Sequence, residues 1–179
     1  MNILLPLLYT LGFGLLGYLC GSLPFAIWIT RLVKGVDVRE AGSGHATTTN
    51  TIRQAGFGPG TLVLVLDIVK GFLPTWLVLH VGRDAIPPYT WLAPLTAALV
   101  VIGHCWPIFA GFRGGMGNAR ASLLTGLLMA PTFWLLGLGS PVIWIAAATG
   151  IVLAGRFTID WKRQYRELWL DRGIAQKCW

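Results

Sequence analysis

Five long apolar runs constrain what this sequence can fold into. They cover residues 7–30, 60–81, 91–109, 121–138 and 141–157, and each is 17 to 24 residues long. A helix needs about 20 mostly apolar residues to cross the hydrocarbon core of a bilayer. Only 12% of the residues are charged, against roughly a quarter in an ordinary soluble domain. The sequence therefore disfavours a soluble enzyme and predicts an all-α polytopic membrane protein with about five transmembrane helices.

The segments between the runs leave no room for a separate soluble domain. The longest of them, residues 31–59, has 29 residues, whereas a domain usually has roughly 50 or more. We therefore expect one transmembrane domain over residues 1–157 and a basic tail over residues 158–179. The first run lacks the basic flank and the small-residue cleavage site of a signal peptide, so we expect it to be kept as a helix.

Basic residues are distributed unevenly between the two expected sides of the membrane. Of the 14 Lys and Arg residues, 11 lie in the segments that follow the first, third and fifth runs, and Arg156 at the end of the fifth run makes 12 on one side. The opposite side has only Arg83, and Lys70 lies inside the second run. Because Lys and Arg concentrate in cytoplasmic loops, the sequence predicts that the N-terminus is outside and the C-terminus inside.

Two segments rich in small residues, both on the predicted inner side, could bind an anion. Residues 42–53 combine Gly-Ser-Gly with three consecutive threonines, an asparagine and an arginine. Residues 111–120 contain four glycines and two arginines. Backbone N–H groups and flanking cations can surround a phosphate, although the Walker order G-x-x-x-x-G-K-[ST] is absent. A flexible loop and a tight turn remain the respective alternatives.

The second run carries two charges, Asp67 and Lys70. Charges inside a span are costly and usually face the bundle interior or water. Their separation of three residues places them on one face of a helix, with Asp67 about 10 Å along the helix from the inner end of the run. Both a structural ion pair and direct contact with a substrate are compatible with this pattern.

The remaining polar and small residues favour structural roles. His104, near the inner end of the third run, is expected to be a hydrogen-bonded interfacial residue. The three histidines do not form a set of zinc ligands, and the three cysteines have no metal or disulfide spacing, so we expect no metal site. Gly17 and Gly21 form a G-x-x-x-G pattern, which predicts close packing of two helices.

Six short motifs, taken in order and spacing, resemble the bacterial acyl-phosphate:glycerol-3-phosphate acyltransferase family. They are Gly21-Ser22-Leu23-Pro24-Phe25, Gly42-Ser43-Gly44, Thr49-Asn50 with Arg53, Leu66-Asp67 with Lys70-Gly71, Gly103-His104 with Pro107, and Phe112-Arg113-Gly114-Gly115 with Gly117. The resemblance implies a seven-helix enzyme of the inner (plasma) membrane. Such an enzyme moves an acyl chain from acyl phosphate to the sn-1 hydroxyl of glycerol 3-phosphate, releasing phosphate and lysophosphatidic acid.

The same resemblance implies which residues perform the chemistry. Catalytic or pocket-organising roles are expected for Ser43, Asp67, Lys70 and His104. Substrate-binding roles are expected for Gly42, Gly44, Asn50, Arg53, Arg113, Gly114, Gly115, Gly117 and Arg120. The expected partners are acyl phosphate, glycerol 3-phosphate and membrane lipid, with no cofactor and no nucleic acid. The H-x-x-x-x-D motif of other glycerolipid acyltransferases is absent after each of the three histidines.

The sequence also departs from the family pattern. The pattern G-S-G-N-x-G-A-T-N is altered at His45, Thr47 and Thr48, and Met116 replaces the second lysine of K-G-G-K-G. Arg120 is a candidate to replace the lost charge, and the two helices before the family's last helix are expected to be missing. Two alternatives therefore stay open. One is a catalytically impaired paralogue that binds anionic lipid or a partner enzyme, and the other is a small anion or lipid transporter.

Overall fold

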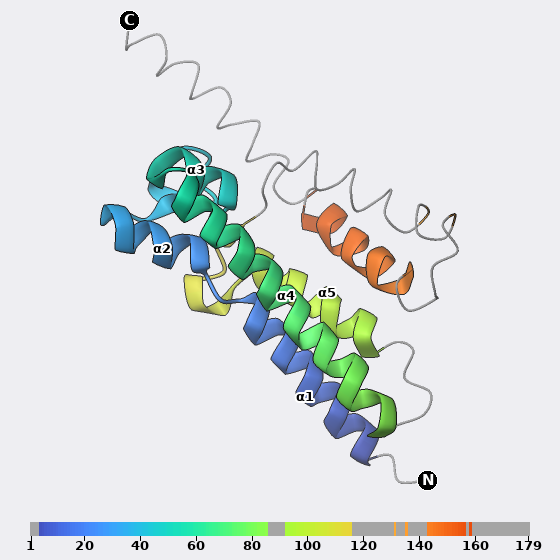
Figure 1. Cartoon of the computed structure of the whole chain (residues 1–179). Helices are drawn as coiled ribbons and strands as arrows, with labels where there is room; N and C mark the ends of the chain where they lie inside the picture. The colour runs from blue at the N-terminus through green and yellow to red at the C-terminus, as the bar shows by residue number, and fades with distance from the viewer. Residues whose placement is uncertain are drawn as a thin grey trace, which may run out of the picture.

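A computed structural model describes residues 4–85, 92–115, 131, 135, 143–156 and 158 (Figure 1). Its elements are α1 (Leu4–Gly21), α2 (Phe25–Lys34), η1 (Val38–Glu40), α3 (Thr48–Ala55), α4 (Phe57–Ala85), α5 (Leu92–Cys105) and η2 (Ile108–Ala110), where η denotes a 3-10 helix. A further apolar helix covers Ile143–Arg156. Over these residues every regular element is a helix, which confirms the all-α prediction.

Three described segments are long and apolar enough to cross a membrane, namely Leu4–Lys34, Phe57–Val81 and Leu92–Ala110. They correspond to the first three predicted runs. The fourth run, residues 121–138, lies outside the described residues apart from Pro131 and Leu135. The fifth run contains the helix Ile143–Arg156, and the predicted tail lies outside the described residues apart from Thr158.

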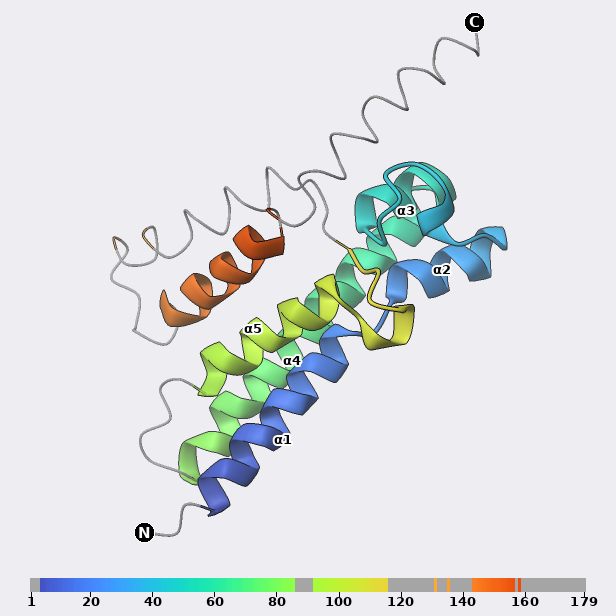
Figure 2. The ribbon, with the colours of Figure 1, turned by 180° about the vertical axis from the view of Figure 1, so that it is seen from behind.

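Helices α1, α4 and α5 form a bundle in which each helix packs against the other two. They lie side by side in both views, and α2 and α3 gather at the end of the bundle where α1 ends (Figures 1 and 2). Helix α3 packs on the first part of α4 and also contacts α2. The loops that carry the predicted site residues therefore meet at the α2–α3 end of the bundle.

Glycines bring α1 and α5 into close contact. A Cβ atom added at Gly17 would lie 2.7 Å from the carbonyl oxygen of Thr96, and one added at Gly21 would overlap the backbone of Val100. In the opposite direction, a Cβ added at Gly103 would lie 2.9 Å from the backbone nitrogen of Ser22. The close packing predicted from the G-x-x-x-G pattern is confirmed, because only glycine leaves room for these approaches.

The first apolar run forms two helices rather than the single helix expected over residues 7–30. Helix α1 ends at Gly21, and α2 begins at Phe25. Proline has no N–H to donate and disfavours helical geometry in the preceding residue, so Pro24 separates the two helices. The hydroxyl of Ser22 donates to the carbonyl oxygen of Tyr18 at 2.7 Å and satisfies an acceptor in the last turn of α1.

The first small-residue segment is folded rather than a flexible loop. Helix α3 begins inside it, with Thr47 as its N-cap: the Thr47 hydroxyl accepts a hydrogen bond from the backbone N–H of Asn50 at 3.2 Å. A cap of this kind contributes about 1 kcal/mol to helix stability. At least one hydroxyl of this segment therefore starts a helix, and the composition alone does not require an anion site.

Candidate functional site

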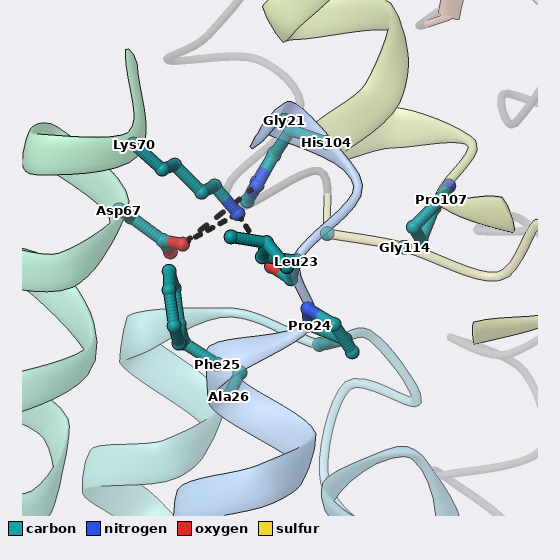
Figure 3. Close-up of a pocket in the computed structure, with 12 residues that line it drawn as sticks. Gly21, Leu23, Pro24, Phe25, Ala26, Asp67, Lys70, His104, Pro107 and Gly114 are labelled. Atoms are coloured by element: carbon teal, nitrogen blue, oxygen red, sulfur yellow. Dashed lines mark hydrogen bonds and ion pairs between the residues drawn. The ribbon is translucent and has the colours of Figure 1, made fainter. Parts of the chain in front are cut away.

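The two charges of the second run form an ion pair. Lys70 Nζ lies 2.7 Å from Asp67 Oδ1, one turn away on α4. The Lys70 side chain is 5% exposed, and the Asp67 side chain is partly exposed. The predicted ion pair is confirmed, and its carboxylate faces the pocket at the α2–α3 end of the bundle (Figure 3). Direct contact with a substrate stays a prediction.

The break between α1 and α2 supplies a second partner for Lys70. Its ammonium group donates to the carbonyl oxygen of Leu23 at 2.9 Å and lies 5.6 Å from the centre of the Phe25 ring. A carbonyl inside a regular helix is occupied by the following turn, whereas one at a helix end is free to accept elsewhere. Pro24 thus links the local sequence to the site, because it creates the break that presents this acceptor (Figure 3).

His104 reaches the same pocket from α5. Its Nδ1 atom lies 4.0 Å from Asp67 Oδ1, and 30% of its side chain is exposed. Figure 3 shows Asp67, Lys70 and His104 converging from two helices. The pocket is lined by Gly21, Leu23, Pro24, Phe25, Ala26, Ala46, Asp67, Lys70, His104, Pro107, Gly114 and Gly115. Three of the four predicted catalytic residues therefore share one pocket.

The second glycine-rich segment packs directly on His104. The backbone N–H of Gly115 donates to the carbonyl oxygen of His104 at 3.2 Å. A Cβ added at Gly115 would lie 2.7 Å from His104 Nε2 and would overlap the carbonyl oxygen of Ala46. A Cβ added at Gly114 would overlap the His104 carbonyl oxygen. Both glycines are required for close backbone approach, and both line the pocket.

Asn50 organises the first loop. Its side chain is 1% exposed, and its Nδ2 donates to the carbonyl oxygens of Val38, Ala41 and His45 at 2.7, 3.0 and 3.1 Å. Its Oδ1 accepts from the backbone N–H of Ser43 at 3.3 Å. Both polar atoms of the amide are therefore occupied by the loop itself, and substrate binding by Asn50 remains a prediction.

The two glycines that flank Ser43 give this loop its shape. Gly42 and Gly44 have φ of +66° and +69°, a conformation that glycine adopts without steric cost. A Cβ on Gly42 would also overlap Asn50 Oδ1. Ser43 itself is half-buried and lies outside the pocket lining. Its catalytic role, and the substrate-binding role of the glycines, stay predictions.

Two of the three predicted arginines lie at the surface. Arg53 on α3 and Arg113 after η2 are exposed, and neither lines the pocket. Gly117, Arg120 and Met116 lie outside the described residues. Within the described part of the chain, no group of three or more His, Cys, Asp or Glu side chains could hold a metal ion.

Sequence reasoning missed Asp37 and Arg39. Asp37 is buried, and the Arg39 guanidinium donates to both of its carboxylate oxygens, at 2.9 and 2.7 Å. These hydrogen bonds lower the pKa of Asp37 to about 2, and the same pair raises the pKa of Arg39. The third guanidinium nitrogen of Arg39, Nη1, donates to the carbonyl oxygens of Ala110 and Arg113. The only signal in the sequence was an Asp and an Arg two residues apart, which by itself predicts nothing specific.

These features define a helical integral-membrane protein with a small polar pocket at one end of its bundle. A family model described as "Glycerol-3-phosphate acyltransferase" matches residues 11–159. The chain therefore belongs to the glycerol-3-phosphate acyltransferase family.

Individual relatives agree with this family. The chain is 38% identical over 159 residues to "Glycerol-3-phosphate acyltransferase 2" of Thermotoga maritima, with 80% of this chain and 78% of the relative covered. It is 42% identical over 118 residues to the "Glycerol-3-phosphate acyltransferase" of Shouchella clausii, with 65% of this chain covered but 56% of the relative. It is 46% identical over 113 residues to the "Glycerol-3-phosphate acyltransferase" of Erwinia tasmaniensis, with 63% of this chain and 53% of the relative covered. The chain thus spans a little more than half the length of these last two relatives.

Two crystal structures of PlsY (YgiH), an integral membrane glycerol 3-phosphate acyltransferase, resemble this fold. The lysophosphatidic acid form superposes with a TM-score of 0.70 at 26% identity, and the glycerol 3-phosphate form with 0.66 at 27%. Each comparison covers 88% of this chain and 92% of the solved chain. The chain therefore shares the fold of these solved structures over most of its length.

Proposed function

We propose that this protein transfers an acyl chain from acyl phosphate to glycerol 3-phosphate and so forms lysophosphatidic acid in phospholipid synthesis. The observation that carries the proposal is the pocket in which Asp67, Lys70 and His104 meet the backbone of Gly114 and Gly115. Family membership and the likeness to PlsY in its glycerol 3-phosphate and lysophosphatidic acid forms support it. Both substrates are anions, which suits a site with a lysine and a glycine-rich backbone.

In the proposed reaction the sn-1 hydroxyl attacks the acyl carbonyl directly. A carbon–oxygen bond to glycerol forms, the bond from the acyl carbon to the phosphate oxygen breaks, and the hydroxyl proton goes to His104 or to the leaving phosphate. An acyl-enzyme fits less well, because Asp67 engages Lys70 at 2.7 Å and lies 4.0 Å from His104. A nucleophilic triad would instead need a carboxylate hydrogen-bonded to its histidine.

Turnover by the purified full-length protein tests this function. With acyl phosphate and labelled glycerol 3-phosphate, we expect lysophosphatidic acid and inorganic phosphate in equal amounts. The altered motif at Met116 keeps the catalytically impaired paralogue as a second candidate. Saturable binding of glycerol 3-phosphate without turnover would favour that candidate. Flux of glycerol 3-phosphate or phosphate across sealed vesicles without turnover would favour a transporter.

We propose that Arg53 and Arg113 bind the phosphate of glycerol 3-phosphate. Each Arg→Ala change should weaken binding by roughly 10- to 150-fold, the effect of losing a hydrogen bond to a charged group. Equilibrium dialysis with labelled glycerol 3-phosphate measures this, and circular dichroism should show unchanged helix content. Lys34→Ala is the matched control, because Lys34 is also basic and exposed but lies on α2. Unchanged affinity in both arginine variants would contradict this assignment.

We also propose a topology with five spans in the inner membrane, the N-terminus outside and the C-terminus inside. The uneven distribution of Lys and Arg supports it. In a variant without the native cysteines, an impermeant thiol reagent applied to intact cells should label single cysteines placed in residues 82–90. It should not label cysteines placed in residues 111–120. The reverse pattern would place the glycine-rich segments on the wrong side for a cytosolic substrate.

A further inference from the structure

One arginine connects η1 to the turn that precedes Gly114 and Gly115. Arg39 lies in η1, between α2 and α3, and its Nη1 donates to the carbonyl oxygen of Ala110 at 2.8 Å. The same nitrogen lies 3.4 Å from the carbonyl oxygen of Arg113. These two acceptors are 71 and 74 residues away in the sequence. Arg39 therefore joins the loop before α3 to the turn that leads into Gly114 and Gly115.

Asp37 fixes the orientation of this arginine. Nε and Nη2 of Arg39 donate to the two carboxylate oxygens of Asp37, and the backbone N–H of Arg39 donates to Asp37 Oδ1 at 3.0 Å. A forked guanidinium–carboxylate pair is planar and directional. Because Nε and Nη2 are both bound to Asp37, the plane of the guanidinium group is fixed. Its Nη1 then points at the carbonyl oxygen of Ala110.

The turn that Arg39 contacts has an unusual backbone. Phe112, which lies between the two acceptor residues, has φ of 60°. A bulky side chain rarely adopts this left-handed conformation, and it persists only where the surroundings fix it. The Phe112 N–H donates to the carbonyl oxygen of Pro107 at 2.8 Å, and Arg39 binds a carbonyl on each side of it. The contacts of Arg39 therefore fall at the strained point of the turn.

We propose that Arg39 is a positioning residue, which fastens this turn to the first loop and so holds Gly114 and Gly115 against His104. It does not line the pocket, so it acts through the turn rather than on a substrate. The path from Arg39 to the pocket is short, because Gly115 donates to the carbonyl oxygen of His104. That Arg39 holds the turn in place does not depend on what the protein does, whereas the effect of Arg39 on turnover rests on the proposed function.

Hydrogen exchange of the full-length purified protein tests the structural part. Arg39→Lys keeps the positive charge. A single ammonium group, however, cannot bind both carboxylate oxygens of Asp37 and also the two backbone carbonyls. The backbone amides of Phe112, Arg113 and Gly115 should exchange roughly 10- to 100-fold faster, as expected when a charge-assisted hydrogen bond that limits local opening is lost. Exchange in α4 should not change. Asp37→Asn, which weakens the fork but keeps Arg39, should give a smaller increase in the same amides.

Arg31→Gln is the matched control. Arg31 also donates to Asp37, at 2.7 Å, but its side chain is 56% exposed and, among the residues that the structure describes, it hydrogen-bonds to that carboxylate alone. We expect exchange of residues 112–115 to stay at the wild-type rate in Arg31→Gln. Unchanged exchange of these residues in both Arg39→Lys and Asp37→Asn would overturn the proposal.

Kinetics then tests the consequence for function. Arg39→Lys should lower kcat by about 10-fold or more while changing the KM for glycerol 3-phosphate little, since a displaced catalytic group costs rate more than binding. Arg31→Gln should retain the wild-type kcat. If the wild-type protein shows no turnover, the proposed function fails, and hydrogen exchange alone still decides whether Arg39 holds the turn.

Discussion

Replacing Lys70 with methionine should destabilise the folded protein by about 3–5 kcal/mol, the cost of removing one partner of a buried ion pair. Asp67 would keep its charge without the ammonium group that lies 2.7 Å away, and the carbonyl oxygen of Leu23 would lose one of its two donors and keep only the backbone N–H of Phe25. Methionine has a similar length, so the change removes charge more than volume. Thermal unfolding in detergent measures the loss, and acyl transfer should fall below detection.

A double variant separates structure from chemistry at this pair. Asp67→Asn combined with Lys70→Met removes both charges, so most of the stability should return, because neutral replacement of a buried pair is often tolerated. Turnover should stay absent if Lys70 also acts on the substrate phosphate. If turnover returns together with stability, the pair is structural only. If Lys70→Met alone is as stable as the wild type, the ion pair does not hold α4 in place.

Local patterns in the sequence predict much of the bundle. Apolar runs mark α1, α4 and α5, because a bilayer span requires a fixed length of apolar helix. The three-residue separation of Asp67 and Lys70 predicts their pairing, since both lie on one helical face. Gly17 and Gly21 predict the close approach of α1 and α5, although the pattern does not name the partner helix.

The pairing of Lys70 with Leu23 needed information that no local pattern holds. The two residues are 47 positions apart, and the contact exists only because Pro24 ends one helix and begins another. A run of apolar residues with one proline is compatible with a kinked helix as well as with two helices. The direction of α2, and therefore the acceptor for Lys70, follows from packing against α3 and α4.

Asn50 shows a different limit. In a sequence of glycines, serine and threonines, an asparagine is equally suited to bind a phosphate or to bind its own loop. The side chain donates to three loop carbonyls, so it contributes to the site through the shape of the loop. The contacts of Arg39 with the second glycine-rich turn had no signal in the sequence, because its acceptors there are backbone carbonyls, which every residue carries.

The largest effect of a single methyl group is expected at Gly115. In Gly115→Ala the added Cβ would lie 2.7 Å from His104 Nε2 and would overlap the carbonyl oxygen of Ala46. The carbonyl is backbone and cannot rotate away as a side chain can, so the glycine-rich segment and the His104 ring must both shift. A displacement of about 1 Å at a catalytic group costs roughly 100-fold in rate, and overpacking lowers stability by about 1–3 kcal/mol.

Gly58→Ala is the matched control for this change. A Cβ at Gly58, in the first turn of α4, meets nothing within 4 Å, and alanine favours a helix over glycine by about 0.8–1.0 kcal/mol. This variant should keep the wild-type kcat/KM and unfold at the same or a higher temperature. Steady-state kinetics of both variants, at matched amounts of folded protein, isolates the effect at His104. Wild-type kcat/KM in Gly115→Ala would show that the contact between this glycine and His104 does not matter for acyl transfer, because the added methyl group falls closest to Ala46 and the His104 ring.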